Sequence, residues 1–334
     1  MPANLTPDYL KADKWFREAT TDEEKILALQ EMMRVIPKHK GTEHIQADLR
    51  KKMSALKESA EKKKKATHGL LDIFHIPKSG AGQVVLLGLP NSGKSAIVAA
   101  ITHAKAHVAD FPFTTSIPLP GIAQYEDIKI EIVDMPPITA EFAPTGIVNT
   151  LRNCDIIGIC VDLSGNIAEQ LKVCFDFLEA RRLMLDPKNP ILDEGGKSLA
   201  RKCFIIATKK DSAPPEAVDN LKKQLTRPME IAAISATDRA SLEKMLADIF
   251  RLLDIVRVYA KKPGHEVDMK DPFVLHKGST VADLALLIHK ELAEKLKTAR
   301  CWPSAGSGGK IHDGQNVHKT HILCDKDIIE LHFA

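Results

Sequence analysis

Eight consecutive residues in the first third of the chain have the types and spacing needed to cradle phosphates. They match the pattern G-x-x-x-x-G-K-[ST] and are Gly88, Leu89, Pro90, Asn91, Ser92, Gly93, Lys94 and Ser95. Glycines let the backbone curl so that several N–H groups point at one phosphate, and Lys94 adds a full positive charge. The Ser95 hydroxyl is a hard oxygen ligand suited to Mg²⁺. We therefore expect a nucleotide phosphate site, in which Lys94 also stabilises charge on a transferring phosphoryl group.

The alternative is a chance match inside a glycine-containing loop. A strand-like apolar run, Val84–Leu87, ends directly before the pattern, and a helix-like stretch, Ala96–Ile101, follows it. A helix N-terminus presents free backbone N–H groups and partial positive charge to an anion. This context favours the phosphate site over chance.

Three further short segments narrow the expected ligand to a guanine nucleotide. Asp134 follows the apolar run Ile128–Val133, at a position where a carboxylate holds Mg²⁺ through water. The run Cys203–Ala207 is followed by Thr208, Lys209, Lys210 and Asp211. Asp211 could accept hydrogen bonds from N1–H and the 2-amino group of guanine, a donor pair that adenine lacks, while the Lys209 stem packs on the base. The last segment is Ser235, Ala236 and Thr237, whose backbone could hydrogen-bond guanine O6.

Short apolar runs alternate with longer helix-like stretches through the middle of the chain. The runs are Val84–Leu87, Ile128–Val133, Ile156–Val161, Cys203–Ala207 and Ile231–Ile234. Apolar runs of this length without alternation are typical of strands buried on both faces of a parallel sheet. The pattern predicts an α/β fold, a doubly wound and mostly parallel sheet of the P-loop GTPase type, with each of the four segments at a strand end.

Different patterns flank this region and predict three domains. We expect an N-terminal helical region with a basic hairpin over 1–76, a GTPase domain over 77–260 and a further domain over 270–334. Helical spacing of apolar residues predicts the hairpin arms, in Ile26, Leu29, Met33 and Ile36 and in Ile45, Leu49, Met53 and Leu56. The last domain should be a small mixed sheet around one helix, which begins at Thr280 and has Leu284, Leu287, Ile288 and Leu292 on one face.

Positive charge is concentrated in the predicted hairpin. The whole chain carries +3, whereas Arg34–Lys65 contains 11 Lys/Arg against 4 acids. A local excess of this kind favours contact with rRNA or a ribosome through phosphate neutralisation. The alternative is a solvated helix face with a lysine-rich tail. We expect no DNA partner.

The remaining composition excludes several classes of protein. No secretion signal and no apolar stretch long enough to span a membrane is present, so we expect a cytoplasmic protein without a membrane partner. The six cysteines are scattered and fit small buried hydrophobes in a reducing compartment. A group near the C-terminus has spacings that match no usual zinc pattern, so we expect structural roles for Cys301, His312, His318, His321 and Cys324.

Longer matches connect the chain to a known family. Gly88–Ser95, with Ala109–Thr115 after it, resembles the Obg and developmentally regulated GTP-binding protein branch of GTPases. The turn Gly41–His44 between basic helices resembles the helical leader of the developmentally regulated proteins. The C-terminal part is similar to a TGS domain, a β-grasp fold, in Gly278–Ala285, Gly314–Val317 and Asp325–Asp327.

The resemblance implies binding of GTP and GDP with Mg²⁺, slow hydrolysis and a role near ribosomes or translation. It implies that Thr115 is the switch threonine, a catalytic residue that ligates Mg²⁺ in the GTP state. The implied metal ligands are Ser95, Thr115 and Asp134. Asn91 matches an asparagine that accompanies activation by K⁺ in related GTPases, so K⁺ is a second implied cation.

Two departures from the family affect the expected activity. The family has Asp-x-Pro-Gly after the third strand, whereas this chain has Asp134–Pro137, and a proline offers no N–H to a γ-phosphate. Ile138 stands where a catalytic glutamine would be. The domain that developmentally regulated proteins carry between the third and fourth motifs is also expected to be missing. Two hypotheses follow: a slow Mg²⁺-dependent GTPase switch, or a GTP/GDP-binding ribosome or RNA adaptor with little or no hydrolysis.

Overall fold

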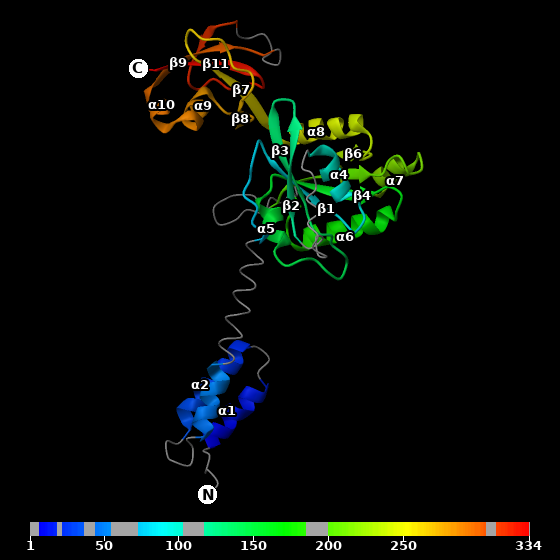
Figure 1. The fold of residues 1–334 in the computed structure, drawn as a ribbon, viewed down its shortest axis with the longest axis vertical. Helices are drawn as coiled ribbons and strands as arrows, with labels where there is room; N and C mark the ends of the chain where they lie inside the picture. The colour runs from blue at the N-terminus through cyan, green and yellow to red at the C-terminus, as the bar shows by residue number, and fades with distance from the viewer. Residues whose placement is uncertain are drawn as a thin grey trace. The chain divides into compact units, whose positions relative to one another are not determined.

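The computed structural model describes residues 7–18, 22–36, 44–54, 73–102, 117–184, 200–304 and 312–333. The chain divides into two compact units, Met1–Asp72 and Ile73–Ala334 (Figure 1). Within the described residues, no helix is long and apolar enough to cross a membrane.

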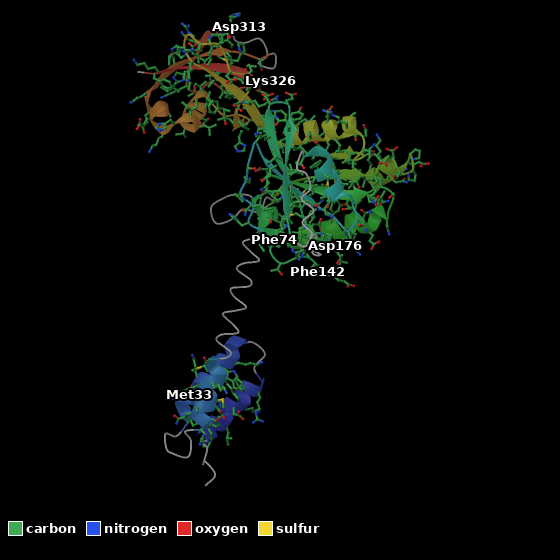
Figure 2. All side chains as sticks on the ribbon, viewed as in Figure 1. Met33, Phe74, Phe142, Asp176, Asp313 and Lys326 are labelled. Atoms are coloured by element: carbon green, nitrogen blue, oxygen red, sulfur yellow. The ribbon has the colours of Figure 1, made fainter. Side chains whose placement is uncertain are left out.

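The first unit is built from helices that share a small apolar core. They are α1 (Pro7–Glu18), α2 (Asp22–Val35) and a helix over residues 44–54. Leu29 and Leu49 are buried between them, and Met33, labelled in Figure 2, packs against the same core. The two arms predicted from apolar spacing are therefore helical over the described residues, and Leu56 of the second arm lies outside them. The lysine run Lys62–Lys65 and Thr115 lie outside the described residues.

A six-stranded sheet forms the centre of the second unit. Its strand order is β2-β3-β1-β4-β5-β6, and only β2 runs antiparallel to its neighbour. The strands are β1 (Gln83–Leu87), β2 (Leu119–Tyr125), β3 (Ile128–Asp134), β4 (Ile156–Asp162), β5 (Lys202–Thr208) and β6 (Ile231–Ala233). All five predicted runs are strands, whereas β2 was not predicted.

Helices cover both faces of this sheet, which confirms the doubly wound prediction (Figure 1). One face packs against α5 (Ile147–Asn153), α6 (Ile167–Ala180) and α7 (Ala217–Gln224), and the other against α4 (Lys94–Ile101) and α8 (Arg239–Leu253). Between Asp134 and Met184 the chain forms only α5, β4 and α6. No inserted domain is present in that segment, and residues 185–199, which belong to the same predicted interval, lie outside the described residues.

A second, five-stranded mixed sheet follows, which we call the C-terminal part (residues 255–333). Its order is β10-β9-β11-β7-β8. The strands are β7 (Ile255–Lys261), β8 (Phe273–His276), β9 (Leu296–Trp302), β10 (Gln315–Val317) and β11 (Asp327–Phe333), and the helices are α9 (Val281–Ile288) and α10 (Lys290–Lys295). The expected domain end at residue 260 thus falls inside a strand of this sheet.

The predicted helix of the C-terminal part begins where expected but is shorter. Thr280 caps α9 in a capping box, since its hydroxyl accepts from the Asp283 N–H and its own N–H donates to the Asp283 carboxylate. The helix ends at Ile288, with His289 as its C-cap, and Leu284 is buried while Leu287 is 53% exposed. The prediction that Leu287 shares the buried face was therefore wrong, because that face also depends on the β-strands that the helix meets.

A buried arginine connects the C-terminal part to the β2–β3 hairpin. The Arg257 side chain on β7 is 3% exposed and donates to Asp325 at 2.6 Å, to Glu126 at 2.6 Å and to Asp127 at 2.7 Å. The Tyr259 hydroxyl also donates to Asp127. Glu126 and Asp127 form the turn between β2 and β3, so one cation holds acidic groups from both sheets together.

Candidate nucleotide-binding site

The loop Gly88–Ser95, which we call the phosphate loop, connects the end of β1 to the start of α4. Its curvature requires glycine at two positions. Gly93 has φ +87°, and a Cβ at Gly88 would lie 2.7 Å from both the Cys160 carbonyl oxygen and Ser92 Oγ. The strand–loop–helix context expected from the sequence is present, with backbone N–H groups at the start of α4 free of side-chain caps.

Lys94 lies inside the curl of the phosphate loop and is 6% exposed. Its ammonium group donates to the Gly88 carbonyl at 3.1 Å, the Leu89 carbonyl at 2.9 Å and Ser92 Oγ at 3.2 Å. Burial lowers the pKa of Lys94, because removing water disfavours the charged form. A phosphate in the loop would give this ammonium group an anionic partner.

Ser95 and Asp134 meet at the edge of the phosphate loop. Ser95 Oγ donates to Asp134 Oδ2 at 2.5 Å. In the part of the chain that the structure describes, Asp134 Oδ1 is buried and has no hydrogen-bond partner. Burial raises the pKa of Asp134. Ser95 and Asp134 thus place two hard oxygen ligands side by side, and Asp134 keeps one buried oxygen without a hydrogen bond among the described residues. Such a pair suits a divalent cation such as Mg²⁺.

Replacing Asp134 with asparagine should stabilise the nucleotide-free protein and remove the Mg²⁺ dependence of nucleotide binding. Asparagine keeps an acceptor for Ser95 and removes a buried charge, so we expect a gain of about 1 kcal/mol. The folded-state pKa of Asp134 is raised, so its ionisation costs stability above that pKa; the gain should vanish below the unfolded value of about 3.9. Thermal unfolding at several pH values, and GTP titrations with and without Mg²⁺, measure the two effects.

The control is Asp176→Asn, which changes an exposed aspartate on α6 and should alter stability by less than about 0.5 kcal/mol. Loss of stability in Asp134→Asn together with an unchanged Mg²⁺ response would contradict the assignment.

The residues expected to recognise the base lie beyond the ends of β5 and β6. Thr208 is buried and its hydroxyl donates to the Ser92 carbonyl at 2.9 Å, which fixes this segment to the phosphate loop. The Lys210 N–H donates to the Ile234 carbonyl at 3.1 Å. A hydrogen bond with Ser235 lowers the pKa of the exposed Asp211, so the two segments predicted separately lie side by side. Ser235 Oγ is 2.9 Å from the Thr237 hydroxyl.

Asp162, at the end of β4, was not among the residues expected from the sequence. Its carboxylate accepts from Lys209 Nζ at 2.5 Å and also from Ser164. Lys209 has φ +57°, so both its backbone and its side chain are fixed beside the expected base site. The sequence did contain a signal for Asp162. This aspartate directly follows the apolar run Ile156–Val161, just as Asp134 follows Ile128–Val133.

The segment after Asp134 is docked on the phosphate loop through Ile138. The Ile138 N–H donates to the Gly88 carbonyl at 3.2 Å, and the Ile138 side chain is fully buried in the core below α5. Pro137, directly before it, offers no N–H. An apolar residue therefore occupies the position where a water-orienting side chain was expected. The hydrogen bond between Ile138 and Gly88 joins two distant backbone segments, so the sequence could not predict it.

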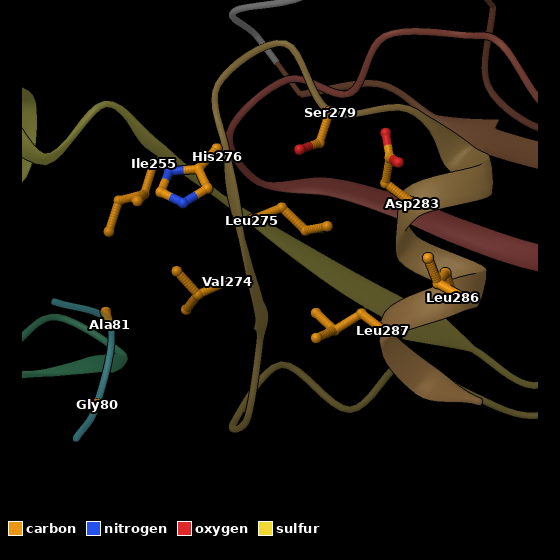
Figure 3. Close-up of a pocket in the computed structure, with 10 residues that line it drawn as sticks. All are labelled: Gly80, Ala81, Ile255, Val274, Leu275, His276, Ser279, Asp283, Leu286 and Leu287. Atoms are coloured by element: carbon orange, nitrogen blue, oxygen red, sulfur yellow. The ribbon is translucent and has the colours of Figure 1, made fainter. Parts of the chain in front are cut away.

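A separate cavity of about 600 Å³ lies away from the phosphate loop (Figure 3). Figure 3 shows Leu287 from α9 pointing toward Val274 on β8, with Gly80 and Ala81 on the opposite side. None of its lining residues belongs to the phosphate loop or to the segments around Asp134, Asp162, Asp211 and Ser235, so this cavity is distinct from the candidate site.

Comparison with known proteins agrees with this geometry. Residues 83–190 match the model of a family described as 50S ribosome-binding GTPase, and residues 256–332 match the TGS domain. Together the two matches cover more than half of the chain.

Two similar proteins are developmentally regulated GTP-binding proteins. "Developmentally-regulated GTP-binding protein 2 homolog" of Dictyostelium discoideum is 28% identical over 92% of this chain and 98% of its own length. "Developmentally-regulated G-protein 1" of Arabidopsis thaliana is 25% identical over 92% of this chain and 90% of its own. The second alignment spans 370 positions, more than the 334 residues of this chain, so that relative has segments absent here. The chain belongs to the DRG/Obg family of GTP-binding proteins, with a GTPase domain followed by a C-terminal TGS domain.

Proposed function

We propose that this GTP-binding protein hydrolyses GTP slowly with Mg²⁺ and acts as a ribosome- or RNA-associated switch. The observation that carries the proposal is the contact between Ser95 and Asp134, at 2.5 Å, beside the buried ammonium group of Lys94. Ser95 and Asp134 supply two ligands for a cation, and the neighbouring Lys94 supplies a positive charge for a phosphoryl group.

Each group of residues has a separate role in the proposed function. The phosphate loop and Lys94 bind the phosphates and stabilise charge on the transferring group. Asp211 accepts hydrogen bonds from guanine, while Lys209, held by Asp162, lies against the base. Bound Mg²⁺ neutralises phosphate charge, and Ser95, Asp134 and Thr115 are its proposed ligands. K⁺ near Asn91 is a further proposed cofactor.

The proposed partner is a ribosome or rRNA, and two features support it. The first unit carries the local excess of positive charge, and the matching family model is described as ribosome-binding. Phosphate release by the purified protein should be measured in Na⁺ and in K⁺, with and without ribosomes, beside titrations of GTP, GDP and ATP. We expect GTP to bind more tightly than ATP and K⁺ and ribosomes to raise turnover. Tighter ATP binding would overturn the role of Asp211, and equal rates in all conditions would overturn the proposed activation.

The alternative is a GTP/GDP-dependent adaptor with little or no hydrolysis, and Pro137 favours it. Where glycine would donate an N–H to the γ-phosphate, proline cannot. The buried Ile138 next to it keeps the segment on the phosphate loop.

Replacing Pro137 with glycine discriminates the two functions. If hydrolysis relies on Lys94 and the phosphate loop, turnover should change less than about tenfold. If the missing N–H disables the switch, restoring it should raise turnover by roughly 10²–10³, the value typical of one oxyanion donor. Single-turnover GTP hydrolysis measures the difference. Pro144→Gly, which lies outside the segment docked on the phosphate loop, is the control for an added glycine.

A further inference from the structure

Three residues far apart in the sequence converge in the C-terminal part. Cys301 lies on β9, His321 lies between β10 and β11, and Asp327 begins β11. Antiparallel pairing of β9 with β11 brings the two strands together. One thiol sulfur, one imidazole nitrogen and one carboxylate oxygen all lie within 4.8 Å of one another.

Polar groups in this cluster lack partners in the region that the structure describes. Neither Cys301 Sγ nor the His321 ring forms a hydrogen bond there, and Ser304 Oγ is buried without a partner. The Asp327 carboxylate, by contrast, is oriented by the Ser304 N–H at 2.9 Å and the Cys324 N–H at 2.8 Å. A fixed carboxylate beside unused thiol and imidazole groups has the form of a ligand set with its supporting hydrogen bonds.

The cluster is not suited to nucleophilic chemistry. Cys301 has no exposed surface, so a substrate cannot reach its sulfur. Burial raises the pKa of the thiol to about 12, with nearby Asp327 adding to the shift, so the free thiol is protonated and unreactive. A small ion that binds the thiolate directly needs no substrate pocket and offsets the buried negative charge.

The mixed donor set selects among metals. Mg²⁺ and Ca²⁺ prefer all-oxygen sites, whereas sulfur, imidazole and carboxylate together suit Zn²⁺. We propose that Cys301, His321 and Asp327 bind Zn²⁺ in the C-terminal part and so link β9, the β10–β11 connection and β11. On binding, the S–H bond of Cys301 breaks, an S–Zn bond forms and the proton passes to solvent, so affinity rises with pH. Three protein ligands leave the fourth position of a tetrahedral Zn²⁺ site to water.

Spacing alone hides this ligand set. The sequence pattern of the cysteines and histidines matches no usual zinc signature, and Asp327 was not considered with them. The tertiary structure brings the Asp327 carboxylate next to Cys301 and His321. It also shows that His312 and His318 lie outside the cluster.

The test uses the full untagged chain, freed of metal and titrated with Zn²⁺, and with Co²⁺ as a spectroscopic probe. We expect about one equivalent bound, with the thiolate-to-cobalt absorption that an oxygen-only site such as Ser95 and Asp134 cannot give. Cys301→Val and His321→Gln should each weaken Zn²⁺ binding by at least about 100-fold, more than the loss of a supporting group does. The matched controls Cys203→Ala and His318→Gln should bind as the native chain does.

Folding is checked separately, because Cys301 is a core residue. Valine is similar in size and apolar, and circular dichroism and GTP affinity should be unchanged in both ligand variants. Zn²⁺ should raise the unfolding temperature of the native chain and leave that of Cys301→Val unchanged. Absence of the thiolate absorption in the native chain overturns the proposal. So does retention of native Zn²⁺ affinity in folded Cys301→Val and His321→Gln.

Discussion

Asp211→Asn should lower GTP affinity by roughly two to four orders of magnitude, because two hydrogen bonds to a charged acceptor are lost at about 1.5–3 kcal/mol each. The asparagine amide presents a donor where the carboxylate presented an acceptor. It should therefore favour xanthine, which carries a carbonyl oxygen in place of the 2-amino group of guanine. Competition titrations with GTP and XTP measure both changes.

Asp219→Asn is the matched control for this exchange. Asp219 is an exposed aspartate on α7 that pairs with Lys222 of the same helix at 2.9 Å. Its replacement should leave the ratio of GTP to XTP affinity unaltered. An Asp211→Asn protein that still binds GTP with native affinity would show that the base lies elsewhere.

Arg257→Met should lower the stability of the C-terminal part by about 3 kcal/mol. Removing one partner of a buried ion pair costs roughly 3–5 kcal/mol because the opposite charges stay in place. The lower end applies because Glu126 and Asp325 remain partly exposed and can regain water. The guanidinium also stacks on Phe250, 4.6 Å from the ring centre, and methionine keeps only part of that contact.

Denaturant unfolding followed by Trp302 fluorescence, in a Trp15→Phe background, reports on the C-terminal part. Arg251→Met is the control: this arginine also pairs with two acids, Glu230 and Asp248, yet its side chain is 61% exposed. Its loss should cost less than about 1 kcal/mol. Equal effects of the two substitutions would mean that the Arg257 cluster is no more than a surface network.

The strands of the first sheet were predictable because each is buried on both faces. A continuous apolar run such as Ile156–Val161 records that burial directly. The edge strand β2 escaped prediction because it contains Pro120 and Gly121 and buries only alternate residues. Likewise β7 was not predicted, and the expected domain end at residue 260 falls inside it, since strand pairing across distant segments leaves no local pattern.

In the candidate site, too, features with a local sequence pattern were predictable and features that depend on tertiary contacts were not. Gly88–Ser95, Asp134 and Asp211 could be predicted because a phosphate loop and a base-binding carboxylate require particular residue types at strand ends, and the structure places them at the ends of β1, β3 and β5. The contact between Ile138 and Gly88 and the ion pair between Asp162 and Lys209 arise from tertiary approach. No spacing rule contains them.

The β2–β3 hairpin has the proposed cation ligand at one end and the C-terminal part at the other. Asp134 pairs with Leu119 at the open end, and Asp127 in the turn is held by Arg257 and Tyr259. One short element therefore connects the two ends, and binding events there are coupled to the extent that each favours the same arrangement of the hairpin. A macromolecule that binds the TGS domain ten times more tightly in the GTP state must raise the GTP-to-GDP affinity ratio tenfold, a coupling of about 1.4 kcal/mol.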